Sequence, residues 1–179
     1  MDELSAFLDA LDRTAPDAPT RCPDWTAHGL LAHMVAGTEE MARLMERATA
    51  GGEVPPTRGF AEREAPWLAV PDHELRAAFP VVGARFAAAL GALPTDRRVP
   101  FTGWTMSGTQ LRTHARSELV LHRWDLVGDD DTGADLLAQP DLLAHGRLAL
   151  ASMPTLQEAR RPPRPDDDLL ALWGRAAEH

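Results

Sequence analysis

The chain of 179 residues contains no lysine and no tyrosine, and its only cysteine is Cys22. Without lysine, the sequence excludes lysine Schiff-base catalysis and the P-loop lysine that contacts nucleotide phosphates. A single cysteine excludes an internal disulfide framework and any cysteine-rich zinc or iron–sulfur site. What remains is a globular composition, 44% apolar and 25% charged, in a chain long enough to bury a core without a disulfide framework.

All 18 basic residues are arginine, and 27 acidic residues bring the net charge to −9. A net-acidic chain without a basic run is not expected to bind nucleic acid. Residues 1–19 lack the basic and apolar regions of a signal peptide. No window approaches the roughly eighteen apolar residues of a membrane span. We therefore expect a cytoplasmic protein that does not contact membranes, as a monomer or a homodimer.

Apolar residues recur at helical spacing along most of the chain. The pattern predicts a short first helix, a long second helix that begins at Thr26 as N-cap, and three more helices: residues 4–11, 26–50, 72–93, 109–128 and 141–153. Pro80 should kink or split the third helix, and Gly128 should end the fourth. Between the helices we expect loops over residues 51–66, 93–108 and 128–135. The first of these is long enough to cover a site or to be mobile, and the second is partly extended.

These elements predict an all-α fold, a four-helix bundle with short N- and C-terminal additions. The bundle should occupy residues 1–155. A tail over residues 156–179 follows, with a linker-like Pro- and Asp-rich run and room for one short helix.

Three ionisable residues lie where the helical pattern predicts core: His33, Glu118 and His122. Glu118 and His122 are four residues apart on the central helix, so both side chains can point to one spot. A carboxylate that faces a core needs a partner such as a proton, an arginine or a metal. Two histidines and a glutamate from two helices match catalytic zinc sites, and they also suit iron or nickel. The alternatives are a surface Glu–His pair and a hydrogen-bonded core histidine.

Two motifs carry a family resemblance. The segment RCPDWTAHGLLAHMVAG, with Cys22, Trp25 and His33, resembles the entry to the metal-binding domain of mycothiol-dependent maleylpyruvate isomerases, which belong to the wider DinB-like family. The segment ELVLHRWDL is similar to that family's E-x-x-x-H-x-W-D-L motif. The resemblance implies a DinB-like bundle with His33, Glu118 and His122 as metal ligands. It covers about residues 1–155.

The resemblance also implies a chemistry. A divalent metal, zinc first and nickel or iron as alternatives, deprotonates a coordinated thiol. The thiolate then adds to an electrophile, giving S-transfer or, after bond rotation and elimination, cis–trans isomerisation. The attacking thiol would be mycothiol or a similar small thiol. The isomerases carry a second, C-terminal domain, whereas here only residues 155–179 follow the fifth helix, so we expect the metal-and-thiol scaffold rather than maleylpyruvate isomerisation itself.

Four further residues are candidates for the site. Asp125, three residues after His122, could orient that ligand or act in catalysis, or it could simply complete the Trp–Asp motif. His114 could act as an acid or base, or belong to a polar helix start. Arg116 and Arg123 could bind a cofactor or substrate carboxylate, or be exposed on the back of the helix.

The remaining candidates have weaker patterns. Cys22 could be reactive or simply packed in its turn. His28, His73, His145 and His179 are expected at the surface.

Two alternatives to a thiol-dependent enzyme remain open at this stage. Metal-bound water could drive hydrolysis, with Asp125 as the only acidic base in the motif. The protein could also be a metal-binding module without catalytic activity.

Overall fold

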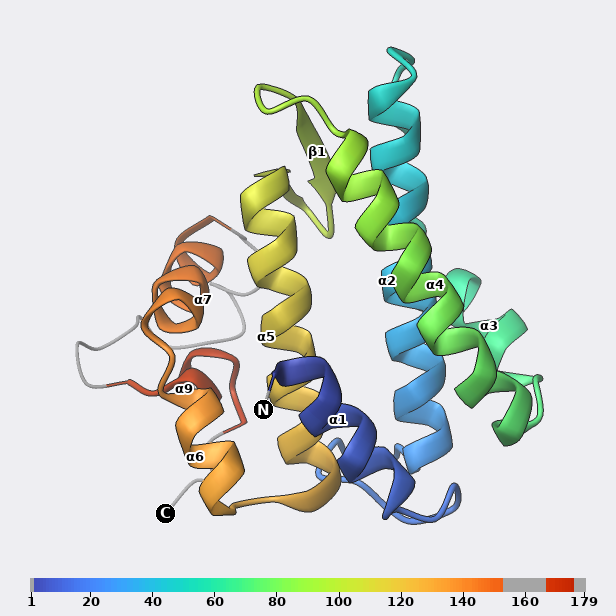
Figure 1. The fold of residues 1–179 in the computed structure, drawn as a ribbon, viewed down its shortest axis with the longest axis vertical. Coiled ribbons are helices and arrows are strands. Elements are labelled where there is room, and N and C mark those ends of the chain that lie inside the picture. The colour runs from blue at the N-terminus through green and yellow to red at the C-terminus, as the bar shows by residue number, and fades with distance from the viewer. Residues whose placement is uncertain (1, 153–166, 176–179) are drawn as a thin grey trace. The chain divides into compact units, whose positions relative to one another are not determined.

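In the computed structural model, residues 2–152 and 167–175 are described (Figure 1). The chain forms two compact units. The first unit combines Met1–Arg13 with Thr113–His179, and the second unit comprises Thr14–Arg112. The described residues are mainly helical, with one short hairpin.

The second unit is built around two long helices, α2 (Ala27–Thr49) and α4 (Asp72–Ala92), which pack against each other. The hydroxyl of Thr26 accepts a hydrogen bond from the Gly29 N–H at 3.2 Å, so the predicted N-cap is confirmed. The buried face of α2 follows the predicted apolar stripe, with Leu30, Met34, Met41, Leu44 and Met45.

Pro80 lies inside α4, yet the helix is continuous, so of the two predicted outcomes the split is wrong and the kink stays a prediction. The proline removes one backbone hydrogen bond, and the packing of α4 on α2 offsets that loss. By length and composition, α4 is the one described helix apolar enough to cross a membrane. The expected absence of membrane contact stays a prediction.

Residues 51–66 do not form one long loop as predicted, because helix α3 (Phe60–Leu68) begins within them. The preceding segment is tied to α2 by Glu40, which is fully buried. Its carboxylate accepts hydrogen bonds from the backbone N–H and the Nε of Arg58, at 2.9 and 2.8 Å, and from Arg43. Burial alone would raise the pKa of Glu40, but these bonds lower it to about 2.

The connector predicted to be partly extended is an antiparallel hairpin of β1 (Arg98–Phe101) and β2 (Trp104–Ser107). Strand residues alternate between buried and more exposed positions. Trp104 and Met106 are on the buried side, 8% and 0% exposed.

The first unit contains the remaining helices: α1 (Glu3–Asp12), α5 (Gly108–Val127), α6 (Asp131–Leu137), α7 (Pro140–Ser152) and α9 (Leu169–Leu172). The first turn of α5 belongs to the second unit, and the helix enters the first unit at Thr113. Gly128 ends α5 with a φ of 74°, as predicted. The acidic stretch predicted as a loop contains α6, because Asp130 caps it by accepting from the Gly133 N–H at 2.6 Å.

The short helix expected in the tail is confirmed as α9. The linker-like run before it lies mostly outside the described residues. The predicted boundary between residues 155 and 156 stays a prediction.

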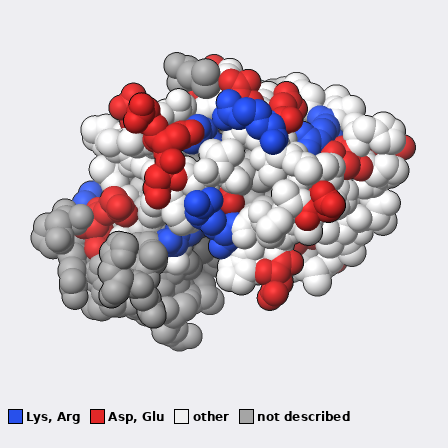
Figure 2. Space-filling view, turned by 90° about the horizontal axis from the view of Figure 1, so that it is seen from below, with Lys and Arg blue, Asp and Glu red and all other residues white. Residues whose placement is uncertain are grey.

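Acidic and basic side chains are interspersed on the face shown in Figure 2, where several arginines lie next to Asp or Glu. Within each unit, the structure describes such pairs between elements. Arg85 of α4 binds Glu46 of α2 at 2.6 Å, and Arg116 of α5 binds Glu3 of α1 at 2.5 Å. Several arginines are thus used in internal ion pairs.

Candidate functional site

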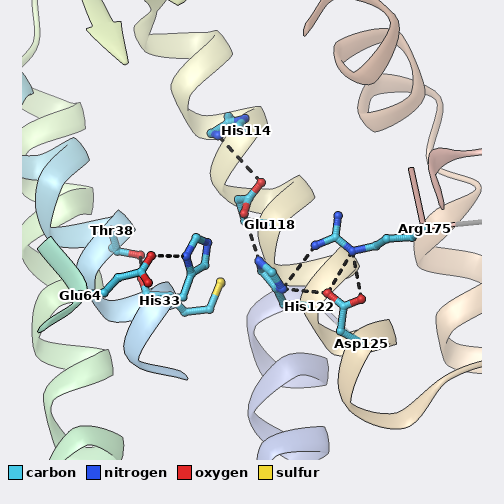
Figure 3. A network of polar contacts seen from close by, with 9 residues as sticks. His33, Thr38, Glu64, His114, Glu118, His122, Asp125 and Arg175 are labelled. Carbon is cyan, nitrogen blue, oxygen red and sulfur yellow. Dashed lines mark hydrogen bonds and ion pairs between the residues drawn. The ribbon is translucent and has the colours of Figure 1, made fainter. Parts of the chain in front are cut away.

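The middle of α5 brings three predicted residues of the first unit together (Figure 3). His122 lies one turn after Glu118 and one turn before Asp125, so all three share one side of the helix. The Nε2 of His122 is 3.2 Å from Oε2 of Glu118, and its Nδ1 is 2.8 Å from Oδ2 of Asp125. His122 and Asp125 are 3% and 1% exposed, whereas the Glu118 side chain is 21% exposed.

These distances constrain the protons of His122. An ionised carboxylate only accepts hydrogen bonds, so the contact with Asp125 places a proton on Nδ1. In the neutral ring, Nε2 then carries the lone pair toward Glu118. A lone pair and a carboxylate oxygen at 3.2 Å repel each other unless a proton or a cation lies between them. The contact therefore requires either an Nε2–H that donates to Glu118 or a cation that both atoms bind.

Asp125 is held from a second direction by Arg175, which follows α9. The Nε of Arg175 donates to both carboxylate oxygens of Asp125 at 3.0 Å. Sequence analysis missed Arg175, because nothing in a Gly-Arg pair near the end of a tail points to a partner 50 residues earlier.

On the other side of Glu118 lies a pair of buried histidines. The Nδ1 of His114 is 3.3 Å from Nε2 of His145 in α7, and the Nε2 of His114 is 3.9 Å from Oε1 of Glu118. Both residues are 5% exposed, and Trp173 lies against His114 with ring centroids 5.7 Å apart. Burial, and then the neighbouring His114, lowers the pKa of His145 from 6.5 to about 4.

The positions of His145 and His114 differ from what the sequence predicted. His145 is not a surface residue, because the α7 face that carries it is packed inside the first unit. His114 is buried rather than part of an open polar helix start. Among the other histidines, His73 has an 82% exposed side chain as expected, His28 is half-buried against Asp72, and His179 lies outside the described residues.

His33 belongs to the second unit and has its own set of neighbours (Figure 3). Its Nδ1 is 2.7 Å from Oε1 of Glu64, which α3 places 31 residues further along the chain. The ring is flanked by Trp25 and Phe60, with centroid distances of 4.9 and 5.7 Å. The guanidinium of Arg63 lies 4.3 Å from the centroid of the Phe60 ring.

Glu64 is the second residue that sequence analysis missed. The run Ala61–Ala65 is made of good helix formers, which could have predicted α3. No local pattern, however, links α3 to His33.

The two arginines predicted to bind a cofactor are engaged in contacts within the first unit. Arg116 binds Glu3, Asp141 and Gln139, which ties α5 to α1 and α7. Arg123 is 2% exposed rather than on an exposed helix back, and its Nη2 donates to Asp130 at 2.6 Å. These ion pairs favour a structural role for both residues.

Cys22 is half-buried in the turn that precedes α2. Its N–H donates to the hydroxyl of Thr20 at 3.2 Å, and that hydroxyl also contacts the Trp25 carbonyl at 3.1 Å. The turn thus places Cys22 and Trp25 just before α2, as the first motif requires.

The sequence matches the family model described as the mycothiol maleylpyruvate isomerase N-terminal domain over residues 1–127. Two uncharacterized proteins of Mycobacterium tuberculosis, MT0763 and Rv0738, are each 30% identical over 169 residues, which are 93% of this chain and 81% of theirs.

Two crystal structures of mycothiol-dependent maleylpyruvate isomerase, one of them a mutant, are similar in fold with a TM-score of 0.69 at 19% identity. The match covers 81% of this chain but only 63% of the isomerase, so the chain spans less than two thirds of that enzyme. This likeness confirms the all-α, DinB-like fold class. On the family match over residues 1–127, the chain belongs to the mycothiol maleylpyruvate isomerase N-terminal domain family.

Proposed function

We propose that the protein is a metal-dependent enzyme that uses mycothiol or a similar small thiol for S-transfer to, or cis–trans isomerisation of, a small electrophile. His33, Glu118 and His122 would hold the metal, with zinc the first expectation and nickel or iron the alternatives. Family membership supports this proposal, because the solved relatives are named as mycothiol-dependent isomerases.

One observation carries the metal proposal: both histidines present the same nitrogen to a carboxylate. Nδ1 of His33 contacts Glu64 at 2.7 Å, and Nδ1 of His122 contacts Asp125 at 2.8 Å. Metal-binding histidines commonly donate one ring N–H to a carboxylate in this way, which fixes the ring and leaves the other nitrogen to ligate. This contact occurs independently on both predicted histidine ligands, and the two together indicate a metal site more specifically than either contact alone.

Glu118 and His122 also meet a simple test of fit. Zinc–nitrogen and zinc–oxygen bonds of about 2.0–2.2 Å place two ligands of one ion roughly 3–3.5 Å apart. The separation of 3.2 Å between Oε2 of Glu118 and Nε2 of His122 lies in that range.

The chemistry divides between the metal and the chain. A free thiol is only slightly ionised at neutral pH, and a dication in this site would deprotonate a thiol that coordinates it. Asp125 orients His122 through its Nδ1–H, and Glu64 does the same for His33. The buried pair of His114 and His145 lies next to the other oxygen of Glu118, with Nε2 of His114 3.9 Å from Oε1 of Glu118.

Hydrolysis by metal-bound water has less support. Its only acidic candidate for the base is Asp125, which is 1% exposed and accepts hydrogen bonds from His122 and Arg175. A carboxylate with this position and these partners suits orientation of a ligand better than proton abstraction from water.

The proposal is tested by the metal content of purified wild type, His33→Ala, His122→Ala and the exposed control His73→Ala. We expect about one metal per chain in wild type and in the control, and at least a tenfold loss in the two ligand variants. Mycothiol with maleylpyruvate and other electrophiles then tests the reaction. Equal metal content in all four proteins would refute the site, and turnover without thiol would refute the thiol mechanism.

A further inference from the structure

Arg175, which follows α9, contacts the buried carboxylate of Asp125, and that carboxylate in turn contacts His122. Arg175 donates from Nε to both oxygens of Asp125 at 3.0 Å, and its Nη2 lies 3.5 Å from Nδ1 of His122 (Figure 3). The side chain of Arg175 is 19% exposed, whereas that of Asp125 is 1% exposed. The contact is therefore largely withdrawn from water, where a charge-assisted hydrogen bond is strong.

The backbone around Arg175 is fixed by a specific helix end. Gly174 has a φ of 71°, which favours glycine, and its N–H donates to the Ala171 carbonyl at 3.1 Å. The N–H of Arg175 donates to the Leu170 carbonyl at 2.8 Å. This pair of bonds is the Schellman arrangement, with Gly174 at the left-handed position. The start of α9 is capped too, because Asp168 accepts from the Ala171 N–H at 2.7 Å.

Helix α9 is also packed tightly onto α7. Leu169, Leu172 and Trp173 are 0%, 2% and 8% exposed. The contact depends on Gly146 of α7, where an added Cβ would lie 3.2 Å from both Leu172 and Trp173. A four-residue helix has little stability alone, so this packing and the two caps determine where Arg175 emerges.

The consequence concerns His122. A buried carboxylate without a cation is costly and would adopt another orientation or take up a proton. Arg175 balances the charge of Asp125 and fixes the plane of its carboxylate, and Asp125 in turn holds the Nδ1–H of His122. We infer that Arg175 is a positioning residue that orients His122 through Asp125, so that the C-terminal segment belongs to the proposed site. This inference rests on the proposed role of His122 as a ligand.

The test compares Arg175→Ala with Arg175→Lys and with Arg147→Ala. Arg147 is the matched control, because its Nη2 donates to the Asp167 carbonyl at 3.3 Å and so ties down the same segment without a described contact to Asp125. Each protein is titrated with Co²⁺, and the dissociation constant and the visible absorption spectrum are recorded. We expect Arg175→Ala to weaken binding about tenfold and to change the spectrum. Arg147→Ala should bind within about twofold of wild type.

Three further results separate positioning from loss of structure. Guanidinium at tens of millimolar should restore part of the affinity of Arg175→Ala, and lysine at position 175 should restore part of it too. In metal-free protein, the ring ¹⁵N shifts of His122 should move from the Nδ1–H form toward a mixture in Arg175→Ala only.

The outcomes distinguish this inference from the proposed function. If wild type binds Co²⁺, His122→Ala does not, and folded Arg175→Ala matches wild type in affinity, spectrum and ¹⁵N shifts, the positioning role is wrong. If wild type binds no metal, the proposed function fails, and the ¹⁵N shifts alone decide whether Arg175 orients His122.

Discussion

The two predicted histidine ligands are held in different ways. His122 contacts a carboxylate three residues away on the same helix, and both side chains are almost fully buried. His33 contacts a carboxylate 31 residues away on another helix, and its side chain and that of Glu64 are 12% and 13% exposed. The carboxylate partner of His122 thus comes from α5 itself, whereas that of His33 depends on how α3 packs on α2.

The two histidine–carboxylate pairs also differ in the chemistry of their neighbours, which are charged for one pair and aromatic for the other. Charged groups support Asp125, because Arg175 donates to both of its oxygens. Aromatic rings flank His33, with Trp25 before α2 and Phe60 at the start of α3. The local pair should therefore be sensitive to charge, and the distant pair to anything that loosens the segment between α2 and α3.

The largest expected effect comes from loosening that segment at Glu40. Glu40→Gln removes a buried carboxylate that binds Arg43 and Arg58, and we expect the free energy of unfolding at pH 7 to fall by about 3 kcal/mol. The pKa of Glu40 is lowered from 4.5 to about 2, so its stabilisation is fully present above pH 4.5 and is lost as the pH falls toward 2. Urea unfolding from pH 7 to pH 2 should show this acid loss in wild type and not in the variant.

His145 in the first unit provides the control, because it titrates in another range. Its pKa is lowered from 6.5 to about 4, so the unfolded chain binds the proton more readily and stability falls between pH 6.5 and pH 4. His145→Gln should flatten the curve in this range and leave the loss below pH 4.5 intact. A Glu40→Gln protein whose stability falls below pH 4.5 as in wild type would contradict the assignment.

A smaller effect should distinguish the two carboxylates that hold the histidines. Removing such a carboxylate typically lowers metal affinity 10- to 100-fold. We expect Glu64→Gln near the lower end and Asp125→Asn near the upper end, because the latter also leaves Arg175 without its buried counter-charge. Competition with a chelator of known zinc affinity measures both.

Glu62→Gln is the matched control for this comparison, since Glu62 is exposed on the same helix as Glu64. It should bind zinc as wild type does. Equal zinc affinity of Asp125→Asn and wild type would show that the contact between Asp125 and His122 does not support the metal. Of the two carboxylates that hold the histidines, Glu64 would then remain to be tested.

The same contrast explains what the sequence could predict. Helices with a long apolar stripe, such as α2 and α5, were found because periodicity is a local property of the chain. The group on α5 was found for the same reason, since i, i+3 and i+4 positions meet on any helix. Helices α3 and α6 were missed, because they lie in Gly-, Pro- and Asp-rich stretches and are fixed by a distant pair and by a single cap.

The residues that sequence analysis missed have long-range partners. Glu64 meets His33 across 31 residues, His145 meets His114 across 31 residues, and Arg175 meets Asp125 across 50 residues. Such pairs depend on tertiary packing, and a single sequence contains no periodic signal for them. The spacing predicted that Asp125 could orient His122, but nothing in the sequence indicated that Arg175 holds the carboxylate of Asp125.

The smallest effects should come from the N-caps of a long and a short helix. Thr26→Ala and Asp168→Ala each remove one capping hydrogen bond, worth about 1 kcal/mol. Helix α2 has 23 residues packed along its length, so Thr26→Ala should lower the global free energy of unfolding by that amount and leave metal affinity unchanged. Helix α9 has four residues, so Asp168→Ala should instead release α9 locally, speed amide exchange at residues 171–175 and weaken metal binding severalfold through Arg175. Exchange followed by mass spectrometry, beside urea unfolding, separates the two. Unchanged exchange at residues 171–175 in Asp168→Ala would mean that packing on α7, rather than the cap, holds Arg175 in place.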